Sequence, residues 1–234
     1  ILRRLSFSEA AFFVRFAKKQ FNRQQRMKSV KVMLLGASLL MLSACGPQVQ
    51  KESEATVTEK SNSEAIIETI LSRRSVRKYR PEQVPDELLD AVLEAGTYAA
   101  SAMGRQSAKI VVVQDAATRA QLTRMNAAVM GADSDPMYGA PTILVVLADA
   151  HANCAVQDGS LVMGNLMLAA ASLGLGSCWI NRAREEFDSA EGKALLKKWG
   201  IEGDWIGVGH CILGYPAAAP KPAAPRKPDY IVKV

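Results

Sequence analysis

The densest group of cationic side chains in the domain part of the sequence follows a stretch with helical spacing. It reads Arg73-Arg74-Ser75-Val76-Arg77-Lys78-Tyr79. Arginine presents a planar fork of donors that matches a phosphate, and a serine hydroxyl adds a directed hydrogen bond. The alternative is a solvated basic helix end whose charge complements the helix dipole. Taken alone, this cluster indicates either a phosphate site or a charged helix C-terminus.

Other motifs that carry chemistry are incomplete or absent. The glycines of 174–176 and 207–209 lack the third glycine of a dinucleotide-binding fingerprint, and the sequence has no P-loop. Ser160 is not in a nucleophile elbow. With two histidines and no CxxC, no metal site is indicated. His210 lies in an apolar run, which favours a core or interface histidine over a catalytic base.

The positive charge of the chain is concentrated near its N-terminus. Of 29 Lys and Arg and 23 Asp and Glu in the chain, residues 1–44 hold nine basic residues and one acidic residue. The remaining residues therefore carry 20 basic and 22 acidic side chains, and are close to neutral. Nucleic-acid binding by the domain is not indicated, because its electrostatic footprint is missing.

The basic segment has the features of an export signal. Residues 27–31 are positively charged, residues 32–41 are apolar but too short for a comfortable membrane span, and Leu-Ser-Ala-Cys follows at 42–45. This order resembles a bacterial lipobox. We expect 27–44 to be a lipoprotein signal peptide and Cys45 to be lipidated, which would anchor the protein to a bacterial membrane in the cell envelope. An ordinary signal peptide with a chance cysteine is the alternative.

Two further segments flank this signal. We expect residues 1–26, which precede Met27, to be an upstream extension, although they could also form an amphipathic helix. Residues 45–62 are polar and have no aromatic residue or periodicity, which is typical of a flexible tether. The domain is therefore expected at 63–234.

Apolar patterning across 63–234 predicts alternating helices and short strands. Helices are expected from Ser63, from Pro85 and over 116–130, 156–173 and 189–199; strands are expected at 110–113, 142–147, 176–180 and 206–213. The 156–173 segment is apolar nearly all round, which predicts burial in a core or between subunits. The tail from Pro216 is rich in Ala and Pro and is expected to run over a surface.

Five ordered segments together resemble the FMN-dependent nitroreductase family. They are 71–79 with 85–89 and 95–96, then 101–106, 173–180, 209–216 and 225–227. Each is weak alone, but their common order over about 165 residues is specific. Two departures affect the expected substrate pocket: Gly104 stands where many members carry Asn, and Ser107-Ala108 stands where they carry Pro and an aromatic residue.

The resemblance implies a set of cofactor contacts. The FMN phosphate and ribityl chain would be held by Arg73, Arg74 and Ser75 with Arg77 near, the isoalloxazine edge by Arg105 and Gln106, the flavin N5 and O4 by backbone N–H groups of Ile180-Asn181-Arg182, and the phosphate again by Arg226 with Lys227. No protein side chain is assigned as catalytic, because the flavin N5 carries the hydride.

The resemblance also implies fold and activity. The expected fold is α+β, with a central mostly antiparallel sheet flanked by helices and an intertwined homodimer that binds two flavins. The expected function is ping-pong hydride transfer from NAD(P)H, through FMN, to a nitroaromatic, a quinone or a similar electron-poor acceptor. The alternatives are a flavin-processing or dehalogenating relative on the same scaffold, and a non-catalytic flavin-binding lipoprotein.

Overall fold

The computed structural model describes residues 61–234. The expectations for 1–26, for 27–44 and Cys45, and for the tether up to residue 60 lie outside that range. The elements are α2 (Asn62–Ser72), α3 (Asp86–Thr97), the 3-10 turn η1 (Ala102–Gly104), β1 (Ala108–Val113), α4 (Ala116–Met130), β2 (Thr142–Asp149), α5 (Ala155–Ser172), β3 (Gly176–Ile180), α6 (Ala183–Asp188), α7 (Ala190–Lys198) and β4 (Trp205–Gly214). Between residues 61 and 234, no helix has the length and apolar character needed to cross a membrane.

The four strands form one antiparallel sheet in the order β1-β2-β4-β3. Every residue of the central strand β2 except the last is buried. Because side chains alternate along a strand, both faces of the sheet must be covered at β2. Ile143, Val145 and Leu147 enter one hydrophobic cluster, whereas Leu144 and Val146 enter the other. Two faces of one sheet thus need two layers of helices, and this confirms the predicted α+β sheet flanked by helices.

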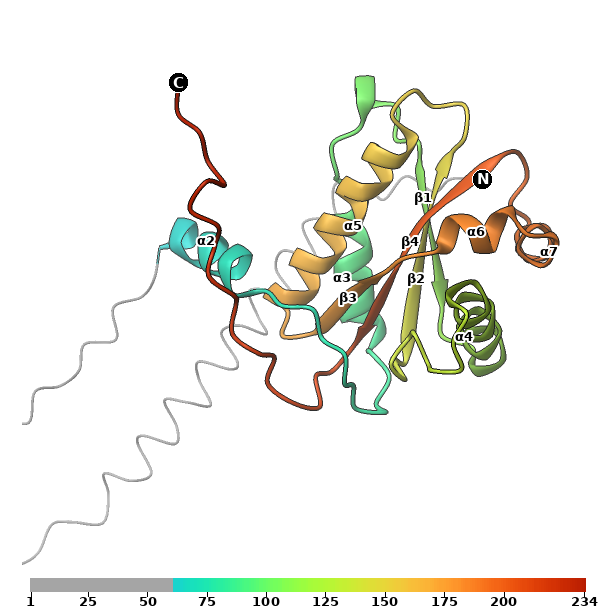
Figure 1. The fold of residues 1–234 in the computed structure, drawn as a ribbon, viewed down its shortest axis with the longest axis horizontal. Coiled ribbons are helices and arrows are strands. Elements are labelled where there is room, and N and C mark those ends of the chain that lie inside the picture. The colour runs from blue at the N-terminus through green and yellow to red at the C-terminus, as the bar shows by residue number, and fades with distance from the viewer. Residues whose placement is uncertain (1–60) are drawn as a thin grey trace, which may run out of the picture. The chain divides into compact units, whose positions relative to one another are not determined.

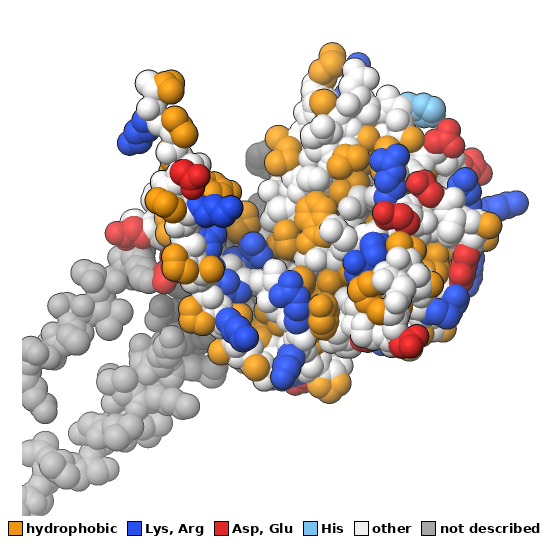
Figure 2. Space-filling model, viewed as in Figure 1, with side chains coloured by type: hydrophobic (Ala, Val, Ile, Leu, Met, Phe, Trp, Pro, Cys, Tyr) orange, Lys and Arg blue, Asp and Glu red, His pale blue; other side chains and the backbone are white. Residues whose placement is uncertain are grey.

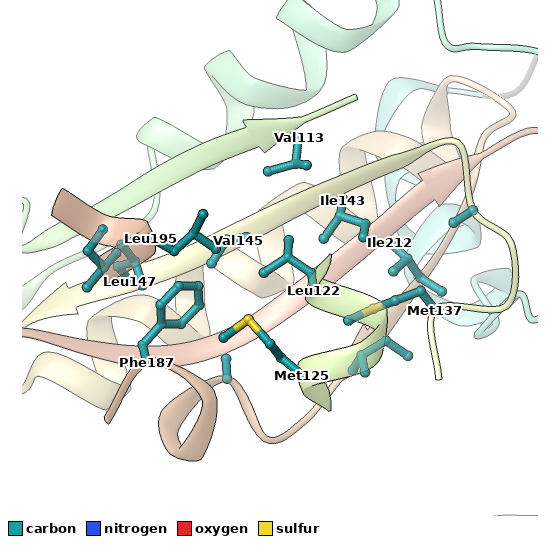
Figure 3. Packing of buried hydrophobic residues seen from close by; sticks show 14 of the residues in the cluster. Val113, Leu122, Met125, Met137, Ile143, Val145, Leu147, Phe187, Leu195 and Ile212 are labelled. Atoms are coloured by element: carbon teal, nitrogen blue, oxygen red, sulfur yellow. The ribbon is translucent and has the colours of Figure 1, made fainter. Parts of the chain in front are cut away.

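Figure 1 shows these two layers, with α3 and α5 on one side of the sheet and α4, α6 and α7 on the other. On the second side, Leu122 and Met125 of α4 pack with Phe187 of α6 against the sheet (Figure 3). On the first side, Leu89 of α3 and Leu166 of α5 belong to the opposite cluster. Each helix layer therefore packs on its own hydrophobic cluster, on one face of the sheet.

Element boundaries follow the sequence pattern closely. The short helix α6 was not predicted. The apolar positions of α2 are exposed, between 49% for Ile70 and 68% for Leu71, and α2 buries no residue. Helix α5 was expected to be buried in a core or between subunits, and in the single chain Val156 and Leu161 on it are 43% and 50% exposed. Both helices thus present apolar surface that this chain alone does not cover.

After β4, the start of the C-terminal tail pairs with residues 78–79, which end the basic cluster. Tyr79 forms an antiparallel bridge with Pro216, and Ala217 N–H donates to the carbonyl of Lys78 at 2.9 Å. Residues 217–234 are exposed. The tail therefore leaves the domain beside the segment that carries the basic cluster, as expected of a surface-running tail.

Candidate functional site

The basic cluster lies where the chain passes from α2 onto the start of β3. Ser75 forms an isolated parallel bridge with Ser177, and Val76 N–H donates to Ser177 O at 3.0 Å. Gly176 is needed beside it, because a Cβ at that position would lie 2.9 Å from the Val76 side chain. Ser75 itself stays exposed. The sheet thus positions the cluster, although the cluster is not part of a named strand.

The arginines of this cluster do not all face the same way. Nη1 of Arg74 donates to the carbonyls of Leu71 and Arg73, each at 2.7 Å, so Arg74 caps the end of α2. Arg77 lies over the ring of Tyr138, 5.9 Å from its centroid. No ion pair within residues 61–234 involves Arg73, Arg74 or Arg77. In Figure 2, several Lys and Arg side chains lie near α2 and below it, and others lie among Asp and Glu at the right of the view.

A second predicted segment, Asn181-Arg182, follows directly after β3. Arg182 has φ 78°, a left-handed conformation that is uncommon for a residue with a Cβ, and it is the N-cap of α6. One buried amide holds both residues. Nδ2 of Asn126 donates to Asn181 O at 2.7 Å, and Nε of Arg182 donates to Oδ1 of Asn126 at 3.0 Å. Asn126, on α4, is fully buried.

Beneath this segment lies a polar group of which the sequence indicated one member, His210, as a core or interface histidine, and missed the others. Glu186 of α6 and His210 of β4 are buried with side-chain exposure of 0%, and Nε2 of His210 lies 2.9 Å from Oε1 of Glu186. The same Oε1 accepts a very short hydrogen bond from Nδ2 of Asn126. Oε2 of Glu186 and Nδ1 of His210 have no hydrogen-bond partner among the described residues.

The third predicted segment lies elsewhere. Arg105 and Gln106 are exposed on the loop before β1, where Met103 and Gln106 adopt φ 56° and 52°. This loop is fastened by Asp158 of α5, whose Oδ1 accepts from Ala102 N–H at 2.9 Å and whose Oδ2 accepts from the Ser107 hydroxyl at 2.6 Å. Ser107, a departure from the family pattern, is thus part of this fastening.

Sheet register separates this loop from the basic cluster. The start of β1 pairs with the end of β2, which pairs with the Trp205 end of β4, whereas Ser177 pairs with Leu213 near the other end. The two β4 positions that mark these sites, Ile206 and Leu213, are seven residues apart, which is roughly 23 Å at the rise of a strand. The same separation is visible in Figure 1, where η1 lies at the top of the view, away from α2. One chain does not bring Arg105 and Gln106 to Arg73.

Two of the hollows formed by the described residues bear on the predicted site. One of about 320 Å³ adjoins the 101–107 loop and is lined mostly by small side chains, with Gln106 and Asp158 at its polar side. The other, of about 760 Å³, lies between α6, α7 and the start of β4, over Phe187 and Trp205. None of the predicted cofactor residues except Gln106 lines either one.

The predicted residues of the tail are exposed and make local contacts. Nη2 of Arg226 donates to the carbonyl of Ala224 at 2.7 Å, and the carbonyl of Lys227 accepts from Tyr230 N–H at 3.2 Å. Neither contact joins the tail to the Arg73 cluster. The structure therefore brings Arg73, Arg74 and Ser75 to β3, places Asn181 and Arg182 at the other end of that strand, and leaves the remaining predicted residues apart.

Comparison with known proteins places this arrangement in one family. The model of the nitroreductase family matches residues 70–132 and 126–215. A protein of Methanothermobacter thermautotrophicus, described as a putative NADH dehydrogenase/NAD(P)H nitroreductase, is 32% identical over 66% of this chain and 79% of its own length. The crystal structure of a Bacteroides fragilis nitroreductase with bound FMN is 32% identical, covers 72% of this chain and 98% of its own, and has a TM-score of 0.67. An FMN-bound nitroreductase of Desulfitobacterium hafniense is 25% identical over 73% of this chain and 98% of its own, with a TM-score of 0.66. This chain therefore belongs to the nitroreductase family of oxidoreductase enzymes.

Proposed function

We propose that the protein is an FMN-dependent oxidoreductase that moves hydride from NAD(P)H to a nitroaromatic, a quinone or a similar electron-poor acceptor by a ping-pong mechanism. The relatives above are described as NAD(P)H nitroreductases or contain FMN. The observation that carries the proposal is the position of Arg73 and Ser75 at the start of β3, free of ion pairs within residues 61–234.

The donors present fit a flavin nucleotide. Arg73 and Ser75 supply a cation and a hydroxyl for a phosphate, and Arg74 would keep its capping role or turn toward the same phosphate. At the far end of β3, Asn181 O points at buried Asn126. Bound FMN would supply reversible hydride acceptance at N5. The chain's own part is to bind the phosphate and to present a dipole or cation to the ring, which stabilises a reduced anionic flavin.

We further propose that each complete site is built by two chains. The Arg73 cluster and the Arg105–Gln106 loop lie at opposite ends of the sheet, too far apart for one flavin. A second copy placed against α2 and α5 would cover the exposed apolar residues of both helices. Light scattering should report a dimer at micromolar concentration; a monomer that still holds flavin would contradict this part of the proposal.

Anchoring to a membrane of the cell envelope remains part of the proposal. It rests on the lipobox-like segment ending at Cys45. Mass spectrometry of protein isolated from a bacterial membrane should find an acylated Cys45 at the mature N-terminus, and Cys45→Ser should abolish membrane association. Isolated protein that retains residues 1–26 would contradict it.

The central test is flavin binding and reduction. The purified protein should be yellow, and anaerobic NADH or NADPH should bleach the flavin band near-stoichiometrically. Arg73→Ala should weaken FMN binding roughly tenfold or more, the usual effect of losing a charge-assisted bond. Arg80→Ala is the matched control, since Arg80 lies in the same segment but is paired with Glu82 at 3.4 Å. A colourless protein that takes up no added FMN would sink the proposal; a yellow protein that no nicotinamide reduces would leave a binder without turnover.

A further inference from the structure

The buried amide of Asn126 makes three hydrogen bonds, all to residues between Asn181 and Glu186. Its two N–H hydrogens serve Asn181 O and Glu186 Oε1, and its oxygen accepts from Arg182. Turning the amide over would set its oxygen against two acceptors and its nitrogen against a guanidinium donor. The orientation of Asn126 is therefore fixed by its three partners.

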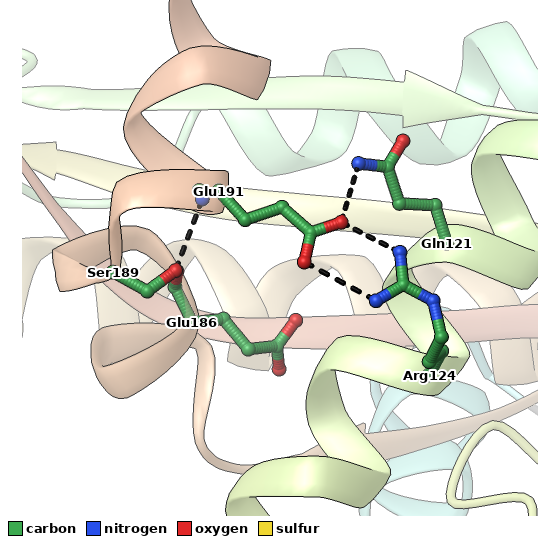
Figure 4. Close-up of polar contacts among 6 residues, drawn as sticks. Gln121, Arg124, Glu186, Ser189 and Glu191 are labelled. Atoms are coloured by element: carbon green, nitrogen blue, oxygen red, sulfur yellow. Dashed lines mark hydrogen bonds and ion pairs between the residues drawn. The ribbon is translucent and has the colours of Figure 1, made fainter.

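Glu186 and His210 hold this amide from below. Glu186 reaches from α6 toward α4 (Figure 4), and His210 of β4 lies against the same carboxylate oxygen. A carboxylate removed from water is costly unless it is paired and hydrogen-bonded. Here α4, α6 and β4 each supply one member, so the pair and the amide lock the junction between the helix layer and the sheet.

The locked amide sets the direction of one backbone group. The chain has no cis peptide among residues 61–234, so the carbonyl of Asn181 and the N–H of Arg182 point in opposite directions. Since the carbonyl points inward at Asn126, the N–H of Arg182 points away from the core. The same amide also holds the guanidinium of Arg182 at 3.0 Å. A residue with φ 78° would otherwise tend to relax.

The geometry points to Asn126 as a positioning residue, supported by Glu186 and His210, that aims the N–H of Arg182 at the reacting edge of the flavin. Its role is to favour the reduced flavin over the oxidised one. This inference rests on the proposed flavin function, and it adds residues from α4, α6 and β4 that touch neither substrate nor cofactor.

The test is the flavin midpoint potential of Asn126→Leu, a variant of similar volume without donors or acceptors. The preference for reduced over oxidised flavin should fall about tenfold, a drop of about 30 mV for a two-electron couple, while the Kd for oxidised FMN changes by less than about threefold. The control is Arg124→Ala on the same helix, where Arg124 meets Glu191 at the surface at 2.6 Å (Figure 4). Its potential should equal that of the unaltered protein.

A second measurement needs no substitution at Asn126. With selectively ¹⁵N-arginine-labelled protein, the backbone resonance of Arg182, assigned by its loss in Arg182→Lys, should move on flavin reduction more than that of Arg119, whose N–H donates within the start of α4. Equal movement of the two resonances, or a folded Asn126→Leu protein with an unchanged potential, would overturn the inference. Absence of FMN binding in the unaltered protein would instead overturn the proposed function.

Discussion

Two loops that adjoin the two edge strands of the sheet, β1 and β3, are held in different ways. The Asn181–Arg182 segment is held by a neutral amide that rests on a fully buried carboxylate and imidazole. The 101–107 loop is held by the carboxylate of Asp158, which is 4% exposed and accepts from the loop through both oxygens. Both loops contain non-glycine residues at positive φ. Each therefore depends on a single buried side chain from a neighbouring helix.

The difference lies in what surrounds each fastening. Around Asn126 three elements close over the polar groups, and the direction of one peptide is fixed. Around Asp158 the loop remains open on one side, with Met103 84% exposed and a hollow of about 320 Å³ beside it. An enclosed set of hydrogen bonds can hold one peptide group in a single direction. A loop that is open on one side leaves a surface that another molecule can cover.

The largest difference in stability between the two regions is expected when two glycines are replaced by alanine. Gly207 lies against the start of α6, and Gly159 follows Asp158 in α5. A Cβ at Gly207 would overlap the carbonyl of Ala183, which is backbone at the start of α6 and cannot move aside, whereas a Cβ at Gly159 would lie 2.5 Å from a methyl of Val208, which can shift. Gly207→Ala should therefore lower the free energy of unfolding by about 3 kcal/mol or more, and Gly159→Ala by about 1 kcal/mol, since alanine also favours the helix. Urea titration of both variants measures the difference. Equal losses would mean that α6 can move as readily as a side chain.

Removing the Asp158 carboxylate should cost less. Asp158→Ala leaves the N–H of Ala102 and the hydroxyl of Ser107 without their acceptor, and we expect a loss of about 2 kcal/mol in the free energy of unfolding because the adjoining hollow admits water. Asp158→Asn keeps an oxygen for Ala102 and serves as the conservative control, with a loss below about 1 kcal/mol. Hydrogen exchange should also quicken at Ala102 and Gln106 in the alanine variant alone. Slower or unchanged exchange there would show that the loop is held by something else.

The sheet between the two loops predicts a smaller, pH-dependent effect. Burial raises the pKa of the Cys211 thiol from 9.0 to about 12, and burial also raises the pKa of Tyr79 above its ordinary 10.0. Both groups are neutral when protonated, so above the unfolded-state pKa the native state binds more protons and stability falls as pH rises. These two groups should leave the free energy of unfolding independent of pH below about pH 8, and should lower it by about 1 kcal/mol between pH 9 and 10. Cys211→Ala should flatten that step, and a slope that persists unchanged would exclude Cys211 as its source.

The smallest effect is expected at the surface tie between α4 and α7. Arg124 and Gln121 both contact the carboxylate of Glu191, close to the Asn126 fastening but outside the buried group. The Arg124 contact lowers the pKa of Glu191, and the exposed pair is screened by solvent. Glu191→Gln should leave flavin content and thermal unfolding essentially unchanged in visible absorbance and circular dichroism. A loss of flavin in this variant would show that the fastening extends to the surface.

The sequence by itself determined the elements and the family. Strands rich in β-branched residues, the apolar helix from Ala155 and the ordered motifs around Arg73, Gly176 and Gly209 are local patterns, and local patterns follow from the periodicity of helices and strands. Residue types named the cluster at Arg73 and Ser75, and the family resemblance named the Asn181–Arg182 segment. The structure sets them at the two ends of β3.

Only the tertiary structure decided which polar residues meet. Asn126, Glu186 and His210 are separated by 60 and 24 positions, and no motif links them; their contact arises because α4 and α6 pack on the face of the sheet that His210 enters. Sheet register also kept Arg105 away from Arg73. Such contacts depend on sheet register and helix packing, which sum many weak interactions over the whole chain and leave no local signature.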